Sequence, residues 1–345
     1  MRSARPKPLH MLCGRPMVMH VIDALHELPI DRVVAVVGHG AERVVKTLQE
    51  LTPPDLVVDF VEQHEQKGTG DAVAVALTAF PDDDMDDGDI VVLPGDTPLL
   101  RAPTLAKLVR AHRQADAAAT ILTARIEDPT GYGRVVRDKA GRVARIVEHN
   151  DATDAEQEIN EVNTSIYCFR RSVLAPSLRR LSPENSQGEY YLTDVIEVLH
   201  DAGYPVVSMV VDDPMDAAGV NDRHQLAIAE AELRDRTNER WMRRGVTMLD
   251  PERTYIDASV ELGTDVTLFP GSILQGATKV GAGAEIGPNT RLVDCTVGDG
   301  AVIENSVCRQ ADIGADARVG PYGVLAPGSQ VPAGTVTGPF YNAEE

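Results

Sequence analysis

The chain has 345 residues, enough for two or three domains. Its 53 acidic and 33 basic side chains give a formal charge of −20, which excludes binding to a nucleic-acid backbone as the main function, because that binding needs a basic surface. No apolar run is long enough for a membrane span, and the N-terminus lacks the apolar stretch of a secretory signal. The four cysteines are scattered without a C-x-x-C pair, which favours a protein of the reducing cytoplasm.

Residues 1–222 alternate between aliphatic runs and helical patterns. The clearest short aliphatic runs are 33–40 and 90–96, and helical patterns follow them at 41–51 and 102–115; further β-like runs are 117–126, 143–149 and 163–169. Continuous aliphatic strands joined by helices predict an α/β fold, with a mostly parallel sheet covered by helices on both faces. The acidic run 82–89 is expected to be a solvated loop.

The remainder of the chain has a different period. Residues 223–244 contain no glycine or proline and predict one connecting helix within a segment 223–250. From 251 to 333 aliphatic residues recur every six positions, which predicts a parallel β-helix of roughly four coils with one inward aliphatic residue on each side of a coil. After a phase slip around 297–306 the series resumes; its members are Leu262, Leu268, Leu274, Val280, Ile286, Leu292, Val307, Ile313, Val319, Leu325 and Val331. The tail 334–345 has no interpretation.

Several short segments could carry chemistry. Asp96 follows an aliphatic strand and Gly95, where ligands bind in open parallel sheets, so it could hold a divalent metal or merely cap the next helix. Gly68 and Thr69 open a helical stretch and could present N–H groups to a nucleotide, or form a plain helix start. Lys7 lies in a basic N-terminal island, and Asn221 offers a neutral oxygen ligand for magnesium.

Taken in order, the segments resemble the bacterial bifunctional family of N-acetylglucosamine-1-phosphate uridylyltransferase and glucosamine-1-phosphate acetyltransferase. The matching strings are P-K-P-L-H-x-L-x-G-R-P-M (6–17), G-T-G (68–70), G-D-T-P-L-L (95–100), G-Y-G-R (131–134), I-V-E-H-x-D-A-T (146–153), E-V-N-T (161–164), N-S-Q-G-E-Y-Y-L-T-D-V-I (185–196) and G-V-N-x-R (219–223). The resemblance implies a Rossmann-like nucleotidyltransferase domain over 1–222, a connecting helix over 223–250 and a left-handed β-helix of hexapeptide repeats over 251–333.

The resemblance also implies a reaction and its residues. UTP and N-acetylglucosamine-1-phosphate would give UDP-N-acetylglucosamine, a cell-wall precursor, and pyrophosphate, with Mg²⁺ as cofactor, in a cytoplasmic homotrimer that binds no nucleic acid and no membrane. The implied roles are a catalytic, triphosphate-binding lysine at Lys7; substrate contacts at Gln63, Gly68, Thr69, Gly95, Asp96, Gly133, Glu148, Asn163 and Asn221; and metal ligands at Asp96 and Asn221. Two alternatives stay open: another pyrophosphorylase, using UTP or dTTP with a different hexose-1-phosphate, and a non-catalytic scaffold or regulatory paralogue.

The sequence departs from the family pattern in several places. The family's first strand and glycine-rich loop would precede Met1, so we expect the natural chain to begin about 10–20 residues upstream, where that loop would cradle phosphate. Asp71 stands where histidine is usual, and Pro94 replaces a more variable residue. All nine histidines lie at or before His224, and Ala326 occupies an arginine position, so acetyltransferase activity is expected to be absent.

Overall fold

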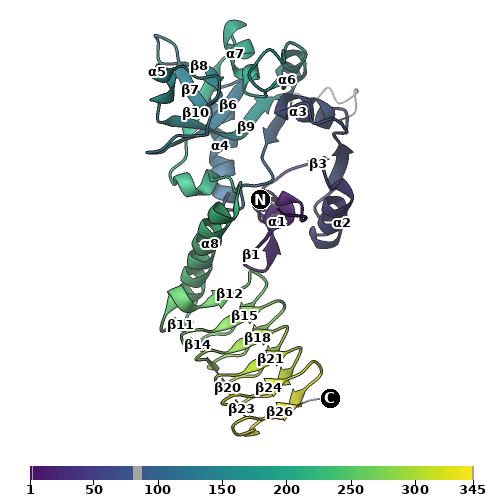
Figure 1. The fold of residues 1–345 in the computed structure, drawn as a ribbon, viewed down its shortest axis with the longest axis vertical. Helices are drawn as coiled ribbons and strands as arrows, with labels where there is room; N and C mark the ends of the chain where they lie inside the picture. Colours follow the sequence, from purple (N-terminus) through teal and green to yellow (C-terminus); the bar gives the residue numbers. More distant parts are fainter. Residues whose placement is uncertain (2, 81–87, 344–345) are drawn as a thin grey trace. The chain divides into compact units, whose positions relative to one another are not determined.

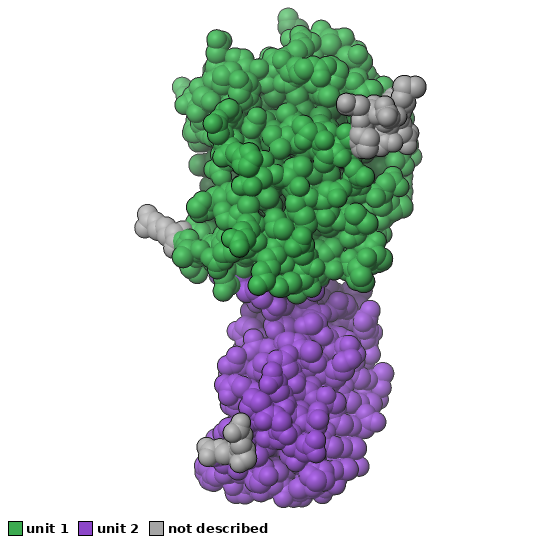
Figure 2. All heavy atoms as spheres, turned by 90° about the vertical axis from the view of Figure 1, so that its right-hand side faces the viewer, with its two compact units in different colours: residues 1–10, 17–223 green, residues 11–16, 224–345 purple. Residues whose placement is uncertain are grey.

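A computed structural model describes residues 1, 3–80 and 88–343, and the chain divides into two compact units (Figures 1 and 2). Unit 1 consists of Met1–His10 and Met17–Arg223, and unit 2 of Met11–Pro16 and His224–Glu345. Most of the acidic run predicted as a loop lies outside the described residues. Among the helices that the structure describes, none has the length and apolarity required to cross a membrane.

Unit 1 has a mixed α/β architecture. The strands are β3 (Val33–Val37), β4 (Val58–Glu62), β5 (Asp89–Val92), β6 (Ala119–Arg125), β7 (Arg134–Arg137), β8 (Val143–Val147), β9 (Glu161–Arg170) and β10 (Val206–Val210). Strands β3 and β4 form a parallel pair, and the larger sheet has the order β10-β6-β9-β7-β8, with β5 also pairing with β9. β10 runs parallel to β6, whereas β9 runs antiparallel to β5, β6 and β7. The predicted α/β class is confirmed, but the larger sheet is mixed and not mostly parallel, because β9 pairs antiparallel with β5, β6 and β7 and β7 pairs antiparallel with β8.

Helices pack around these strands. They are α1 (Met17–His26), α2 (Ala41–Leu51), α3 (Thr69–Leu77), α4 (Ala102–Gln114), α5 (Asp154–Gln157), α6 (Arg171–Leu178) and α7 (Asp194–Asp201), with short 3₁₀ turns η1 (Lys7–Leu9) and η2 (Pro214–Ala217). α2 and α4 match the predicted helices 41–51 and 102–115. Their apolar faces are buried at Leu48, Leu105 and Leu108, because the amphipathic period places those side chains on one side of each helix.

Unit 2 begins with the predicted connecting helix and a short hairpin. Helix α8 (Arg223–Arg243) is continuous, and its Trp241 joins the apolar core of the β-helix. The hairpin of β1 (Met11–Leu12) and β2 (Arg15–Pro16) is fixed by its turn: the Cys13 N–H donates to Glu230 of α8 at 2.9 Å, and the Ala258 N–H donates to the Cys13 carbonyl at 2.9 Å. A segment distant in sequence is thereby tied to the start of the β-helix.

The hexapeptide period forms a parallel β-solenoid with three sheets. One sheet contains β11 (Thr247–Met248), β14 (Thr267–Leu268), β17 (Glu285–Ile286), β20 (Val302–Ile303) and β23 (Arg318–Val319); the second contains β12 (Tyr255–Ile256), β15 (Ile273–Gln275), β18 (Arg291–Val293), β21 (Val307–Arg309), β24 (Val324–Leu325) and β26 (Asn342–Ala343); the third contains β13 (Glu261–Leu262), β16 (Lys279–Val280), β19 (Thr296–Val297), β22 (Asp312–Ile313) and β25 (Gln330–Val331). The solenoid has about five turns, not the four predicted, because pairing already begins at β11 and continues to β26.

The predicted inward series is wrong at one position after the phase slip. Cys308 is fully buried and stacks between Leu292 and Leu325, whereas Val307 is only half-buried. The coil sides that end at Val297, Cys308 and Ile313 are five residues long instead of six, which shifts the inward position. Non-glycine residues with positive φ turn the shortened corners, at Asp294, Asn305 and Gln310.

Candidate active site

Three predicted site residues meet beyond the carboxyl end of β5. Lys7 Nζ donates to Asn221 Oδ1 at 2.6 Å and forms a short ion pair with the Asp96 carboxylate. The backbone supports this meeting, because the Val220 N–H donates to the Asp96 carbonyl at 2.9 Å. A carboxylate and an amide oxygen, contributed by distant parts of the sequence, therefore face one positive charge.

Local sequence places Lys7 at this point. Pro6 precedes the η1 turn and Pro8 lies within it, so the backbone of the lysine has little freedom. The Leu9 N–H donates to the Pro6 carbonyl at 3.0 Å and closes the turn. Both charged side chains remain partly accessible, with Lys7 34% and Asp96 25% exposed, so the pair can be reached from solvent.

The donor set suits a divalent cation. Asp96 supplies an anionic oxygen and Asn221 a neutral one, and both lie within hydrogen-bonding distance of the same ammonium nitrogen. Hard oxygen donors of this kind are the ligands that Mg²⁺ and Ca²⁺ take in proteins. Gly95 precedes the carboxylate, and the nearest atom to a Cβ built there is Val18 Cγ2 at 3.8 Å, which leaves space beside the backbone.

A second cluster forms where β4 ends and α3 begins. Gln63 directly follows β4, and its side-chain amide donates to the Gly68 carbonyl at 3.2 Å and to Asp71 Oδ2 at 2.7 Å. Gly68 has φ +107°, and a Cβ there would lie 2.6 Å from the Tyr190 carbonyl oxygen, so this backbone approach requires glycine. Helix α3 begins at Thr69, so its first turn lies beside the Gln63 amide.

A third cluster surrounds Glu148, at the end of the β7–β8 hairpin. A Cβ on Gly133 would lie 3.4 Å and 3.5 Å from the two Glu148 carboxylate oxygens, and the Asn163 N–H donates to the Gly133 carbonyl at 2.8 Å. Thr193 Oγ1 donates to Glu148 Oε1 at 3.2 Å. Burial raises the pKa of Glu148. Asn163 itself is buried, and its side-chain amide donates to the Tyr167 hydroxyl at 2.8 Å.

One segment connects the second and third clusters. The Leu192 N–H donates to Thr69 Oγ1 at 3.1 Å, while the next residue, Thr193, bonds Glu148. Burial, followed by the charge of Asp96, raises the pKa of Tyr132, the residue before Gly133. The third cluster therefore lies near the first. All ten predicted site residues thus belong to unit 1 and fall into three neighbouring clusters.

Sequence analysis did not identify three residues of this region as candidates. Asp71 was noted only as a departure from a pattern, and Thr193 and Asp194 only as part of a matching string. Burial, followed by the charges of Glu197, Glu148 and Asp151, raises the pKa of Asp194 to about 6. Contacts of this kind depend on how 185–196 folds back onto α3 and β8, which no local pattern contains.

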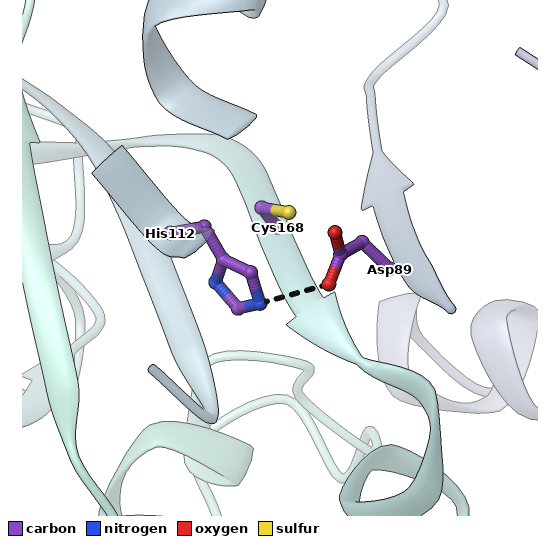
Figure 3. A group of neighbouring side chains, drawn as sticks. All are labelled: Asp89, His112 and Cys168. Carbon is purple, nitrogen blue, oxygen red and sulfur yellow. Dashed lines mark ion pairs between the residues drawn. The ribbon is translucent and has the colours of Figure 1, made fainter. Parts of the chain in front are cut away.

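Another group of possible metal ligands lies at the opposite end of β5. Figure 3 shows the His112 ring directed toward the Asp89 carboxylate, at 3.4 Å, with Cys168 beside them. Arg113 already pairs with Asp89 at 2.6 Å, and burial raises the pKa of the Cys168 thiol to about 12, which favours its neutral form. His112 also bonds the Thr120 hydroxyl at 2.9 Å. We interpret this group as a packing network that holds α4 against β5 and β9.

The chain is similar in sequence to proteins of known family. Residues 2–238 match the family described as nucleotidyl transferase. The chain is 46% identical over 341 residues to "Bifunctional protein GlmU" of Streptomyces avermitilis, covering 99% of this chain and 70% of that protein. It is 44% identical over 340 residues to the protein of the same name from Brevibacillus brevis, covering 99% of this chain and 72% of that protein.

A solved structure shares the fold alone. CMP:2-keto-3-deoxy-manno-octonic acid synthetase complexed with CTP superposes with a TM-score of 0.50 at 21% sequence identity, covering 67% of this chain and 93% of that one. The sequence relatives are far closer and extend through both units. The chain is therefore a nucleotidyltransferase, and it belongs to the family of bifunctional GlmU proteins that its motifs resemble.

Proposed function

We propose that the chain is a Mg²⁺-dependent uridylyltransferase that converts UTP and N-acetylglucosamine-1-phosphate into UDP-N-acetylglucosamine and pyrophosphate. A phosphate oxygen of the sugar phosphate would form a bond to the α-phosphorus of UTP. The bond from that phosphorus to the bridging oxygen of the β-phosphate would break, and pyrophosphate would leave. The observation that carries this proposal is the convergence of Lys7, Asp96 and Asn221 at the carboxyl end of β5.

Each cluster has a part in this reaction. Asp96 and Asn221 would hold Mg²⁺, which supplies positive charge against the phosphate oxygens. Lys7 would bind the triphosphate and stabilise charge that develops on it, since its ammonium is held next to the metal ligands by a rigid turn. No covalent intermediate with the protein is needed, because in-line transfer depends on alignment and charge neutralisation.

The other two clusters would determine the substrates. Gln63, Gly68 and Thr69 would contact uracil, and Gly133, Glu148 and Asn163 would contact the amino sugar. The half-buried Glu148 carboxylate supports this assignment, because a buried acceptor is well suited to receive sugar hydroxyl or amide hydrogens. Leu192 is hydrogen-bonded to Thr69 and its neighbour Thr193 to Glu148. These two hydrogen bonds support a base subsite and a sugar subsite that lie on either side of the segment containing Leu192 and Thr193.

The test is pyrophosphate release by the purified full-length protein with UTP, Mg²⁺ and N-acetylglucosamine-1-phosphate. We expect Asp96→Ala to lower kcat/KM by about 100-fold or more, because the carboxylate proposed to hold the cation would be lost. Asp212→Ala is the matched control, since that carboxylate is 78% exposed and pairs with Lys107 on the surface. Retention of more than about a tenth of the activity by Asp96→Ala would refute the metal assignment.

A panel of sugar-1-phosphates and nucleotides separates the alternatives. A preference for glucose-1-phosphate by about tenfold or more would reject the amino-sugar assignment, and a preference for dTTP would reject the nucleotide assignment. Magnesium dependence is tested by chelation followed by Mg²⁺ addition, which should restore the rate. A full-length wild-type protein that releases no pyrophosphate with any substrate pair would favour the scaffold interpretation.

We also propose that the solenoid assembles a homotrimer. Its support is a set of exposed apolar side chains in unit 2, namely Leu249, Tyr255, Tyr322, Val324, Val336 and Phe340, of which Phe340 is 74% exposed. Contiguous exposed apolar surface is typical of areas covered by another chain, and the Tyr322 and Phe340 rings lie side by side with centroids 5.2 Å apart. Sedimentation equilibrium should give three times the chain mass of 37.2 kDa, and a monomer would refute the proposal.

A further inference from the structure

The side-chain amide of Gln63 is fixed in one orientation by its neighbours. A primary amide has two N–H donors and one carbonyl acceptor. In this structure one donor reaches Asp71 Oδ2 at 2.7 Å, and the amide nitrogen also lies 3.2 Å from the Gly68 carbonyl oxygen. Both donors therefore have partners, and the Gln63 carbonyl oxygen is the polar atom left to bind a ligand.

Asp71 prevents the opposite orientation. If the amide rotated by half a turn, its carbonyl oxygen would lie where the nitrogen now lies, 2.7 Å from Asp71 Oδ2. Two oxygen acceptors at that separation repel each other, and the Gly68 carbonyl would also lose its donor. The position of Asp71 is itself secure, because it belongs to the first turn of α3, where the helix dipole favours a negative charge.

The fixed amide lies where a nucleotide base would bind. Gln63 follows the carboxyl end of β4, and its backbone N–H donates to the Val37 carbonyl at the end of β3, at 2.8 Å. Ligands in parallel sheets bind at such strand ends. We infer that Asp71 is a positioning residue for base selectivity: by holding the Gln63 amide with its oxygen toward the ligand, it selects pyrimidines that carry an N–H at position 3, uracil and thymine, against cytosine.

The inference rests on the proposed function, since it assigns the base subsite of that reaction. It goes beyond it because Asp71 touches no substrate and acts only through Gln63. Uracil and thymine donate a hydrogen at N3, whereas neutral cytosine has a lone pair there. An acceptor oxygen facing that lone pair would be left without a partner in the complex, and a site that rejects a ligand in this way can discriminate strongly.

The test compares UTP with CTP on wild type, Asp71→Ala and Asp71→Glu. Asp71→Ala frees the amide to rotate, so the ratio of kcat/KM for UTP to that for CTP should fall by about tenfold or more, through KM rather than kcat. Asp71→Glu keeps a carboxylate near the amide and should restore part of the ratio. Glu65→Ala, which removes an exposed carboxylate from the same segment, should leave the ratio unchanged.

Equilibrium binding of the two nucleotides to the same four proteins separates this inference from the proposed function. If the wild type prefers UTP to CTP in binding, Asp71→Ala loses that preference, and neither protein releases pyrophosphate, the inference is supported and the proposed reaction is refuted. Normal catalysis with unchanged selectivity in Asp71→Ala would overturn the inference and leave the reaction in place. A full-length wild-type protein that binds neither nucleotide would overturn both.

Discussion

Replacement of Asp194 by asparagine should stabilise the chain above pH 6. The carboxyl group lies in the first turn of α7, next to Thr193, and burial together with Glu197, Glu148 and Asp151 raises its pKa from 3.8 to about 6. The difference between these two pKa values corresponds to about 3 kcal/mol. Because the side chain keeps some solvent contact, we expect a gain of about 2–3 kcal/mol at pH 7.5.

The sign of the effect follows from proton binding. The folded chain retains the Asp194 proton up to about pH 6, whereas the unfolded chain releases it near pH 3.8. Unfolding between these values therefore releases a proton, so the free energy of unfolding falls as the pH rises from 3.8 to 6 and stays low above that. Asparagine does not ionise, so the advantage of Asp194→Asn should shrink to about half between pH 7.5 and pH 5.

Urea unfolding of unit 1 between pH 5 and pH 8 measures this difference, with hydrogen exchange of α7 peptides to report on the helix itself. Glu184→Gln is the control, because that carboxylate is exposed in the preceding loop, and its effect should stay within about 0.5 kcal/mol at every pH. A difference between Asp194→Asn and wild type that does not change with pH would refute the reasoning. So would a variant that is less stable than wild type at pH 7.5.

Two further predictions concern the solenoid and the cation site. Leu292→Ala removes a fully buried side chain that is stacked between Leu274 and Cys308. It should lower the free energy of unfolding of the solenoid by about 3–5 kcal/mol, as measured by urea unfolding. A loss below about 1 kcal/mol would contradict this packing. Asn221→Ala removes the neutral oxygen of the proposed cation site and should raise the Mg²⁺ concentration for half-maximal rate by about tenfold, because one of the two proposed ligands would be lost. An unchanged Mg²⁺ titration would exclude Asn221 as a ligand.

The sequence predicted the solenoid well because its fold depends on a repeated local rule. One inward aliphatic residue per side, at a fixed period, is enough to identify the coil. The six-residue period predicted the wrong inward residue only where coil sides shorten to five residues. There the pattern could not tell whether Val307 or Cys308 points into the core. Both are apolar neighbours, and the choice depends on positive-φ corners at Asn305 and Gln310, where the residue types do not require such a conformation.

The mixed sheet was harder to predict than the helices. Aliphatic runs indicate buried strands, but they do not give the direction in which neighbours pair. β9 is ten residues long and runs antiparallel to β5, β6 and β7, so strands distant in sequence meet through it. Because β9 carries Asn163 at one end and Cys168 near the other, that single strand links the third cluster, around Glu148, to the packing network around Asp89.

In the candidate site, too, motifs identify residues, whereas the contacts between those residues depend on how the chain packs. Motifs identified Asp96 and Asn221 as candidates, and the fold brings both to one ammonium group. Motifs could not say which atom of Gln63 faces a ligand, because an amide carries donors and an acceptor on one group. That choice is made by Asp71, a residue eight positions later that reaches Gln63 only after α3 folds against the end of β4. The base selectivity that we infer thus depends on a contact between two side chains, and a sequence pattern that scores each residue separately cannot detect it.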